Sequence, residues 1–492
     1  MPALPGSPRH FATAARLTGL AGVAVLAVLT GCASIPDGDA PPLPRWTQVL
    51  PERQLSLRAI VPAGTACPSA TVDGVAQSLH ARVGAPSSDF PVTLCERAVA
   101  TTTRQASIAG QPLPLAAAEI RRIVIVGDTG CRIKVPASGH GDPIQDCTNP
   151  AAWPWARVAG AAAATQPDLV IHLGDYHYRE YCRQPALCAA LSTQGTPVGY
   201  DWAGWNADFF TPAAALLRAA PWVTVRGNHE NCDRGGEGWQ RLLSPLPPQT
   251  CPTGDDGRPP RSVLSNNATA AAYRVELPGL PALIVADNAG HEDYRAADSA
   301  PHESAVFEKS LAALLNAADR QPFWLLIHKP LWYDLLAADL PANSLQTTLR
   351  TRLPATLSIV FAGHEHAFQT INFATAPATT SAQNSGQRPA QLIVGNSGTQ
   401  LEIFDPASPF FANGQAAASQ ERWQANERLY DGSAAASGVV VHRYGFLLLE
   451  RVGDDPTGPW TGSLRDPDGR PLADCRLDNA RKRVHCAPAA VH

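Results

Sequence analysis

The chain has 492 residues, of which 45% are hydrophobic, and this is enough for a sizeable core in two or three domains. Its 39 basic and 43 acidic residues give a net charge of −4, and no basic run stands out. This charge balance gives no support to a nucleic-acid partner. It leaves anionic small substrates open, because a bound metal can supply positive charge locally.

The first 32 residues predict an export signal rather than part of the fold. Arg9 and Arg16 precede an apolar run at residues 17–29, which is too short to span a bilayer comfortably. The tetrapeptide Leu-Thr-Gly-Cys at residues 29–32 resembles the bacterial lipobox, so Cys32 would carry the lipid. An ordinary secretory peptide is the alternative, because small residues also mark plain cleavage sites. We therefore expect an exported protein that is lipid-anchored in the bacterial envelope. The resemblance to lipoproteins implies the outer membrane, facing the periplasm or the exterior, because Ala33 and not an aspartate follows Cys32.

The next segments differ in composition. Residues 33–45 are rich in Pro and Asp and indicate a flexible tether. Residues 46–118 alternate short apolar runs with Pro and Gly, with no amphipathic helix longer than residues 75–83, so we expect a small, mostly β N-terminal domain. A large domain follows at residues 119–452, and residues 453–492 predict a C-terminal β extension.

Strands and helices alternate through the large domain. The apolar runs that predict strands lie at residues 123–126, 169–173, 222–225, 270–277, 282–286, 323–327 and 356–361. The segments that predict helices lie at residues 153–166, 208–220, 303–318 and 345–353. This alternation indicates an α/β layered fold in which helices flank a sheet.

Ten cysteines remain besides Cys32, and an even number in an exported chain indicates disulfides. Metal ligation by cysteine is the weaker interpretation, because no CxxC pair occurs and the expected compartment is oxidising. The cysteines fall into pairs that are adjacent in the sequence and close short loops, which predicts the bonds Cys67–Cys95, Cys131–Cys147, Cys182–Cys188, Cys232–Cys251 and Cys475–Cys486.

Five of the predicted strands end in side chains suited to metal ligation. These side chains are Asp128; Asp175 with Tyr178; Asn228 with His229; His328; and His364 with His366. Because ligands of open α/β sheets bind at the carboxyl ends of strands, one shared site is favoured over five separate turns. Two carboxylates, a phenol, an amide and several imidazoles exceed the needs of one ion. They suit two ions about 3.5–4 Å apart with one carboxylate between them.

At this point the sequence resembles the calcineurin-like metallophosphoesterases, and within them the purple acid phosphatase branch. The wider family begins with Asp-x-His, whereas Gly-Asp-Thr-Gly at residues 127–130 has a glycine in place of that histidine. The purple branch instead has a tyrosine three residues after its second aspartate, where Tyr178 stands. Gly-Asn-His-Glu at 227–230 and Gly-His-x-His at 363–366 also match. The resemblance spans about residues 121–400 and implies a β-sandwich flanked by helices, with residues 119–452 as the catalytic domain.

The resemblance also implies a role for each matching residue. The ligands would be Asp128, Tyr178 and His366 for a ferric ion, Asn228, His328 and His364 for a divalent iron, zinc or manganese ion, and Asp175 as the bridge. A phenolate is a hard anionic donor that stabilises iron(III), whereas imidazoles suit divalent ions. His229 would contact the phosphate or protonate the departing alkoxide.

The implied activity is hydrolysis of a phosphate monoester or diester, on a phosphorylated small molecule or ester. Metal-bound hydroxide would attack phosphorus in line while the two ions absorb charge on the phosphoryl oxygens. Animal and plant purple phosphatases have further histidines where this chain has Ala337 and Ala338. The resemblance therefore does not imply broad activity on phosphate monoesters.

Several alternatives stay open at this stage. Tyr178 could be a packed aromatic, with manganese or zinc in both sites, and His229 could be structural. Glu230, His177 and Arg226 lie beside expected ligands, and we expect them to support the ligands rather than to catalyse. The alternative from another class is a metal-binding envelope lipoprotein that serves as a non-catalytic scaffold, but loss of ligands usually accompanies such a change, and no expected ligand is missing here.

Overall fold

The computed structural model describes residues 44–83, 85–133, 144–180, 189–191, 193–251, 272–290, 321–332, 354–373, 388–401 and 435–489, all within the unit formed by residues 43–492. The expected signal segment with Cys32, the Cys182–Cys188 pair, the helices expected at 303–318 and 345–353, and the pair Ala337 and Ala338 lie outside these ranges. Within them, no helix is long and apolar enough to cross a bilayer.

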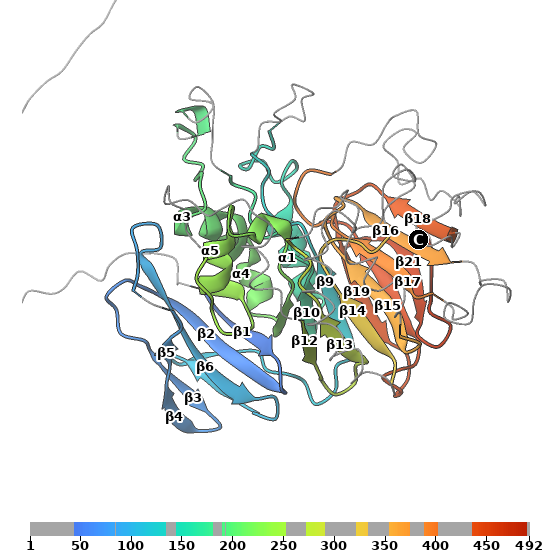
Figure 1. Cartoon of the computed structure of the whole chain (residues 1–492), viewed down its shortest axis with the longest axis horizontal. Coiled ribbons are helices and arrows are strands. Elements are labelled where there is room, and N and C mark those ends of the chain that lie inside the picture. Colours follow the sequence, from blue (N-terminus) through green and yellow to red (C-terminus); the bar gives the residue numbers. More distant parts are fainter. Residues whose placement is uncertain are drawn as a thin grey trace, which may run out of the picture. The chain divides into compact units, whose positions relative to one another are not determined.

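An 11-stranded sheet forms one layer of the molecule (Figure 1). Its central strands run parallel and are, in spatial order, β9 (Arg122–Val126), β10 (Leu169–His172), β11 (Trp222–Thr224) and β1 (Arg45–Leu50). Antiparallel strands extend it beyond β1 as β2 (Gln54–Pro62), β6 (Val92–Ala100) and β5 (His80–Ala81). On the other side it continues as β19 (Phe446–Arg451), β20 (Trp460–Arg465), β21 (Pro471–Asp478) and β22 (Arg483–Pro488).

A seven-stranded sheet forms the second layer. Its parallel strands are β13 (Ala282–Val285), β14 (Phe323–Leu326), β15 (Leu357–Ala362) and β17 (Ala390–Val394). Its antiparallel strands are β12 (Tyr273–Val275) at one edge, then β16 (Phe368–Phe373) and β18 (Ala435–Val441) at the other. A small third sheet consists of β4 (Val75–Ser78), β3 (Ser69–Val72), β7 (Ala106–Ile108) and β8 (Gln111–Pro112).

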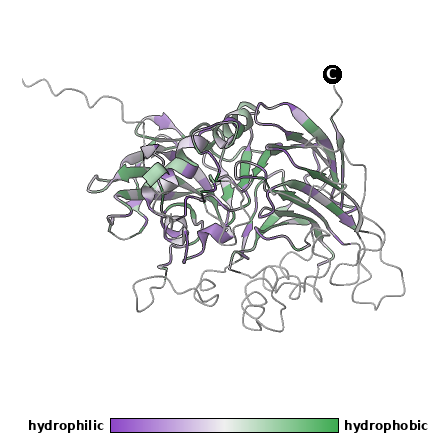
Figure 2. Ribbon diagram, turned by 90° about the horizontal axis from the view of Figure 1, so that it is seen from above, coloured by the Kyte–Doolittle hydropathy of each residue, from purple (hydrophilic) through white to green (hydrophobic). Residues whose placement is uncertain are grey.

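The main core lies between the two large sheets. Ile123 and Ile125 of β9 belong to the same buried cluster as Trp324 of β14 and Phe361 of β15. The alternate residues of β9, such as Val124, belong to a second cluster on the opposite face of the sheet. Both faces of the central strands are therefore buried, which explains why these strands are continuous apolar runs and why hydrophobic residues concentrate on them in Figure 2.

Helices cover the outer face of the 11-stranded sheet (Figure 1). The elements that contribute to the cluster on this face are α1 (Trp155–Ala164), α3 (Trp202–Trp205), the π-type turn η1 (Asn206–Phe210), α4 (Thr211–Leu217) and the π-type turn η3 (Trp239–Leu243). Between β11 and η3 the chain also forms the single turn η2 (Asn228–Glu230) and α5 (Gly236–Gly238). The α/β layered fold predicted from the sequence is confirmed by this arrangement of a β-sandwich flanked by helices.

Two local predictions differ from the structure. Residues 75–83 form strands β4 and β5 instead of a helix, because β3 and β6 supply backbone partners for them. The helix expected at 208–220 begins earlier, at Trp202, where the Asp201 side chain accepts a hydrogen bond from the backbone of Gly204 at 2.9 Å.

Strands from both terminal regions join the sheet of the large domain, namely β1, β2, β6 and β5 from the first region and β20, β21 and β22 from the last. Gln48 of β1 lies beside Trp222 of β11, and β19 joins β20 to β9. The division into separate N-terminal and C-terminal domains stays a prediction. Of the predicted disulfides, the structure contains Cys67–Cys95, Cys131–Cys147, Cys232–Cys251 and Cys475–Cys486.

Candidate metal centre

The loops that carry the candidate ligands leave the two sheets at one shared edge. In the first sheet, Val126, His172 and Thr224 are paired across β9, β10 and β11, so the three following loops begin at one level. In the second sheet, the backbone N–H of Gly363 after β15 donates to the carbonyl of His328 after β14, at 2.9 Å. Parallel strand order therefore brings all five loops together at the carboxyl ends of the strands, where open α/β sheets bind their ligands.

Two contacts join the loops of one sheet to those of the other. The Nδ1 atom of His328 lies 2.8 Å from the carbonyl oxygen of Leu173. The backbone N–H of His364 donates to Oδ2 of Asp128 at 3.0 Å. The candidate ligands thus meet in one place although they come from both layers of the sandwich.

One half of the cluster surrounds the hydroxyl of Tyr178. This hydroxyl lies 2.7 Å from Oδ2 of Asp175, 3.2 Å from Oδ1 of Asp128 and 2.9 Å from Nε2 of His366. All four side chains are buried, with Asp128 and Asp175 at 0% and 1% exposure. We call these four residues the tyrosine half.

The other half surrounds Nε2 of His328. This atom lies 2.9 Å from Oδ1 of Asn228 and 3.2 Å from Oδ2 of Asp175. The potential ligand atoms of Asp175, His328 and His364 all lie within 4.8 Å of one another. We call these four residues the amide half. Asp175 belongs to both halves, which is the position that a bridging carboxylate would need.

The tyrosine half has more hydrogen-bond acceptors than donors. The hydroxyl of Tyr178 has one proton, yet two carboxylate oxygens and a ring nitrogen lie within hydrogen-bonding distance of it. Carboxylate and phenol oxygens and an imidazole nitrogen gathered at one buried point form a donor set that suits a metal cation. The residues present therefore fit a metal ion.

The ring orientations of two histidines support the same conclusion. Nδ1 of His328 faces the carbonyl of Leu173, and Nδ1 of His366 faces the carbonyl of Gln400, at 2.8 Å in each case. A carbonyl oxygen only accepts, so each Nδ1 donates its proton to that carbonyl and each Nε2 is directed into the cluster. This is how metal-ligating histidines are held in proteins.

Burial shifts the pKa values of the side chains in the tyrosine half towards their neutral forms. Burial, followed by the charge of Asp175, raises the pKa of Asp128 well above its ordinary value. Burial and the two carboxylates also raise the pKa of Tyr178 well above that of a free phenol. Burial, with the nearby charge of Arg132, lowers the pKa of His366 to about 3, so this imidazole is neutral. A bound cation would reverse the first two shifts, because it favours the anionic form of each oxygen ligand.

The amide half differs because its imidazoles lie close to the bridging carboxylate. Burial acts to raise the pKa of Asp175, but His328 and His229 outweigh it, and the pKa lies well below the ordinary value. Asp175 is therefore the carboxylate that stays ionised, whereas Asp128 is the one that burial favours in the neutral form.

Three of the candidate ligands have left-handed backbone conformations. The φ angles are +55° at Asp128, +58° at Asp175 and +74° at His364. Non-glycine residues rarely adopt this region, and such strained positions concentrate at functional sites. The backbone turns sharply as it leaves each strand, which directs these side chains into the cluster.

His229 lies at the rim of the cluster, on the ring of Tyr178, with 3.7 Å between the ring centroids. Its Nδ1 lies 3.3 Å from Oε1 of Glu180, and its Nε2 lies 3.9 Å from Oδ2 of Asp175. Arg234 contacts both His229 and Glu180 through its guanidinium. No sequence motif contains Glu180 or Arg234, although Arg234 follows Gly-Asn-His-Glu by four residues.

Glu230, which we expected to support the ligands, holds the backbone of two ligand loops. Its carboxylate accepts the N–H groups of Asp175 and Tyr176, both at 2.9 Å, and that of Gly227 at 3.0 Å. Of the other two expected supporting residues, Arg226 pairs with Asp287 at 2.7 Å. His177 is buried, with its ring 5.5 Å from that of Trp205.

The chain is similar to known proteins in sequence pattern and in fold. A family model described as calcineurin-like phosphoesterase matches residues 121–368. Among solved structures, a purple acid phosphatase from yellow lupin (Lupinus luteus) seeds is similar at 13% identity and a TM-score of 0.51, over 89% of this chain and 74% of the lupin chain. This likeness shows a shared fold.

Two further solved structures are similar over most of their length. PhoD has 11% identity and a TM-score of 0.49, over 91% of this chain and 92% of its own. A dimetal phosphatase from Danio rerio has 12% identity and a TM-score of 0.38, over 73% of this chain and 99% of its own. The comparison with curated protein sequences found no match.

Proposed function

Because this chain belongs to the calcineurin-like phosphoesterase family and is therefore a phosphoesterase, we propose that it hydrolyses phosphate esters at a centre of two metal ions. The observation that carries the proposal is the position of the Tyr178 hydroxyl, within 3.2 Å of two buried carboxylates and an imidazole. A phenol oxygen, two carboxylates and an imidazole that converge in a buried site form a donor set suited to a metal cation.

The two halves of the cluster would each hold one ion. The first ion would be held by Asp128, Tyr178 and His366, the second by Asn228, His328 and His364, and Asp175 would bridge the two. A phenolate ligand favours ferric iron in the tyrosine half, and the imidazoles and amide of the other half suit divalent iron, zinc or manganese. When bound, such a pair of ions supplies an activated water as nucleophile and neutralises charge on the phosphoryl oxygens.

His229 would act on the substrate from the rim of the cluster. Its Nδ1 lies 3.3 Å from the Glu180 carboxylate, its Nε2 lies 3.9 Å from Oδ2 of Asp175, and Nη2 of Arg234 lies within 2.9 Å of both ring nitrogens. The Nε2 atom would then contact the phosphoryl group or hold the proton for the departing alkoxide. The imidazole packs against the ring of Tyr178 at an interplanar angle of 30°, which restricts its rotation.

The substrate would be a phosphorylated small molecule or ester, as a monoester or a diester. The presence of Ala337 and Ala338 leaves both classes open, since further histidines that serve the leaving group in animal and plant purple phosphatases are replaced. A non-catalytic scaffold is not proposed, because every ligand of the cluster is present.

We also propose that the protein is exported and lipid-anchored through Cys32 in the bacterial envelope, at the outer membrane. The disulfides of the described residues support an oxidising compartment, because such bonds do not persist in the cytoplasm. Metabolic labelling with a radioactive fatty acid tests the anchor: wild type should be labelled, and Cys32→Ser should not.

A chain lacking residues 1–32 tests the activity. It should hold two metal ions by elemental analysis and hydrolyse at least one of a panel of chromogenic phosphate monoesters and diesters. Asp175→Ala should lose both ions and the activity. Activity that survives this substitution, or a wild-type chain without bound metal, would refute the proposed centre.

A further inference from the structure

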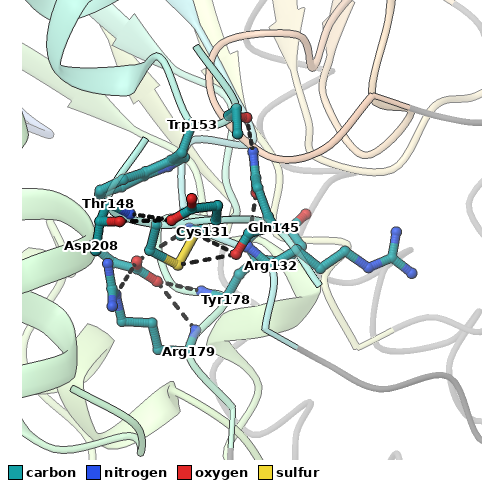
Figure 3. Close-up of a disulfide and its surroundings, with 12 residues drawn as sticks. Cys131, Arg132, Gln145, Thr148, Trp153, Tyr178, Arg179 and Asp208 are labelled. Atoms are coloured by element: carbon teal, nitrogen blue, oxygen red, sulfur yellow. Dashed lines mark hydrogen bonds and ion pairs between the residues drawn. A yellow bond between two sulfur atoms is a disulfide. The ribbon is translucent and has the colours of Figure 1, made fainter. Parts of the chain in front are cut away.

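Asp208, which no motif of the sequence singles out, is fully buried behind the tyrosine half. It lies on the π-type turn η1, and such turns occur frequently at functional sites. Its Oδ2 accepts the backbone N–H groups of Tyr178 at 2.7 Å and Arg179 at 3.1 Å (Figure 3). Its Oδ1 accepts the Nε–H of Arg179 at 2.6 Å and the backbone N–H of Cys131 at 3.1 Å. One carboxylate thus binds the loop of Tyr178 to the loop that follows Asp128.

Gly130 allows the carboxylate of Asp208 to approach the backbone of Tyr178 closely. A Cβ atom at position 130 would lie 2.6 Å from the backbone nitrogen of Tyr178 and 3.0 Å from Oδ2 of Asp208. Any side chain there would push the two apart. The glycine after Asp128-Thr129 is therefore explained by the approach of Asp208 to Tyr178.

Gln145 holds the other side of the tyrosine half in a similar way. Its Oε1 accepts the backbone N–H of Arg132 at 2.9 Å and that of Gln400 at 3.2 Å. Its Nε2 donates to the carbonyl of Gly398 at 2.8 Å. The carbonyl of Gln400 in turn lies 2.8 Å from Nδ1 of His366 and fixes the orientation of that ring.

The hydrogen bonds of Asp208 and Gln145 meet at two adjacent residues, Cys131 and Arg132. Cys131 contacts Asp208, and Arg132 contacts Gln145, through their backbone N–H groups. The disulfide Cys131–Cys147 fastens this segment to the residue two positions after Gln145 (Figure 3). The segment after Asp128 is therefore the common support for Tyr178 and His366.

We propose that Asp208 and Gln145 are positioning residues of the metal centre, which hold Tyr178 and His366 in place for the first ion. This inference rests on the proposed function, because it assigns these ligands to a bound metal. A ligand that is fixed before the metal binds loses less conformational freedom on binding. The two residues act on the tyrosine half and contact no ligand of the amide half among the described residues.

Two isosteric substitutions separate this role from general folding. In the wild type each carboxylate oxygen of Asp208 accepts two hydrogen bonds. In Asp208→Asn one of these oxygens becomes an NH2 group, which cannot accept and so faces two N–H donors. In Gln145→Glu the carboxylate would face the carbonyls of Gly398 and Ala152, both of which now accept from Nε2. Asp201→Asn is the matched control, because Asp201 caps the adjacent helix α3 through a single backbone hydrogen bond.

The experiment uses the chain loaded with Zn²⁺ alone and follows its release to a chelator. Wild type should release two ions in two phases. Asp208→Asn and Gln145→Glu should each release one ion about 10- to 100-fold faster, the range typical of residues that orient ligands. The other ion should leave at the wild-type rate, and Asp201→Asn should retain both as wild type does.

A second measurement keeps the test decisive if Asp208→Asn folds poorly. Gly130→Ala should accelerate release of the same ion, and with ferric iron the variants that fold should shift the tyrosinate absorption band. Release of both ions at wild-type rates from Asp208→Asn and Gln145→Glu would overturn the positioning role, as would equal acceleration of both ions. A wild-type chain that holds no zinc would instead refute the proposed function itself.

Discussion

The hydroxyl of Tyr178 lies 2.7 Å from Oδ2 of Asp175, a residue only three positions earlier in the same loop. This short separation puts a phenol and a carboxylate of one loop on the same side of the candidate metal centre. The left-handed conformation of Asp175 makes it possible, because the chain reverses at the end of β10. Tyr178 is therefore a ligand candidate by geometry and not only by its place in a motif.

Tyr178→Phe should remove one ligand while keeping the ring that packs on His229. We expect weaker binding of the first metal by about 10- to 100-fold and, in a ferric protein, loss of the visible absorption band. Absorption spectra and elemental analysis measure both effects. The matched control is Tyr176→Phe, whose hydroxyl donates to the carbonyl of Val225 at 3.1 Å. It should lose about 1 kcal/mol of stability and keep its metal. An unchanged spectrum in Tyr178→Phe would exclude the phenolate ligand.

Glu230→Gln should loosen the loops of Asp175 and Asn228 together. Both carboxylate oxygens of Glu230 accept hydrogen bonds from backbone N–H groups, whereas glutamine has only one accepting oxygen. We expect a loss of about 1–3 kcal/mol in the free energy of unfolding, because buried donors lose their acceptor. Chemical denaturation measures it. Glu237→Gln, at an exposed pair with Arg241, should change stability by less than about 1 kcal/mol. Equal effects of the two substitutions would contradict this role of Glu230.

Gly174→Ala should lower the free energy of unfolding by more than the strain of a positive φ angle alone would. Gly174 has φ +100°, and a Cβ atom there would lie 2.5 Å from Nδ1 of His328. Gly110, with φ +76° and no atom within 4 Å of such a Cβ, is the matched control. Gly110→Ala should cost about 1–2 kcal/mol from backbone strain. Gly174→Ala should cost more and also displace His328, which thermal unfolding and metal analysis would detect. Similar losses in both variants would rule out the collision.

Glu96 is not one of the candidate ligands, and it should make the free energy of unfolding depend on pH in the acid range. Burial acts to raise the pKa of Glu96, but Arg58 and Arg82 outweigh it and lower the pKa in the folded chain. A carboxyl whose folded pKa is depressed contributes stability above its unfolded pKa, about 4.3, and loses it as pH falls through the folded value. The stability difference between wild type and Glu96→Gln should therefore shrink from pH 7 to pH 3.

Urea denaturation at a series of pH values checks this prediction. Glu52→Gln, at an exposed turn position, is the control and should show the same pH dependence as wild type. A constant difference between wild type and Glu96→Gln across this range would show that the carboxyl does not titrate against its two arginines.

The apolar runs of the sequence determined where the central strands lie and which side chains follow them. Residues 123–126 and 169–173 were expected as strands, and β9 and β10 occupy them within one residue at each end. A strand buried on both faces has a purely local signature, an unbroken apolar run, so the sequence alone reveals it. Because parallel strands present their carboxyl ends at one edge, the clustering of the following ligands was also predictable.

The sequence did not determine which distant residues support those ligands. Asp208 and Gln145 are a carboxylate and an amide without a local pattern, and their partners are backbone groups of other loops. The same is true of Glu180 beside His229, and of residues 75–83, whose strands exist because β3 and β6 lie alongside. Hydrogen bonds between segments far apart in the chain depend on how the sheets pack, and only the tertiary structure decides them.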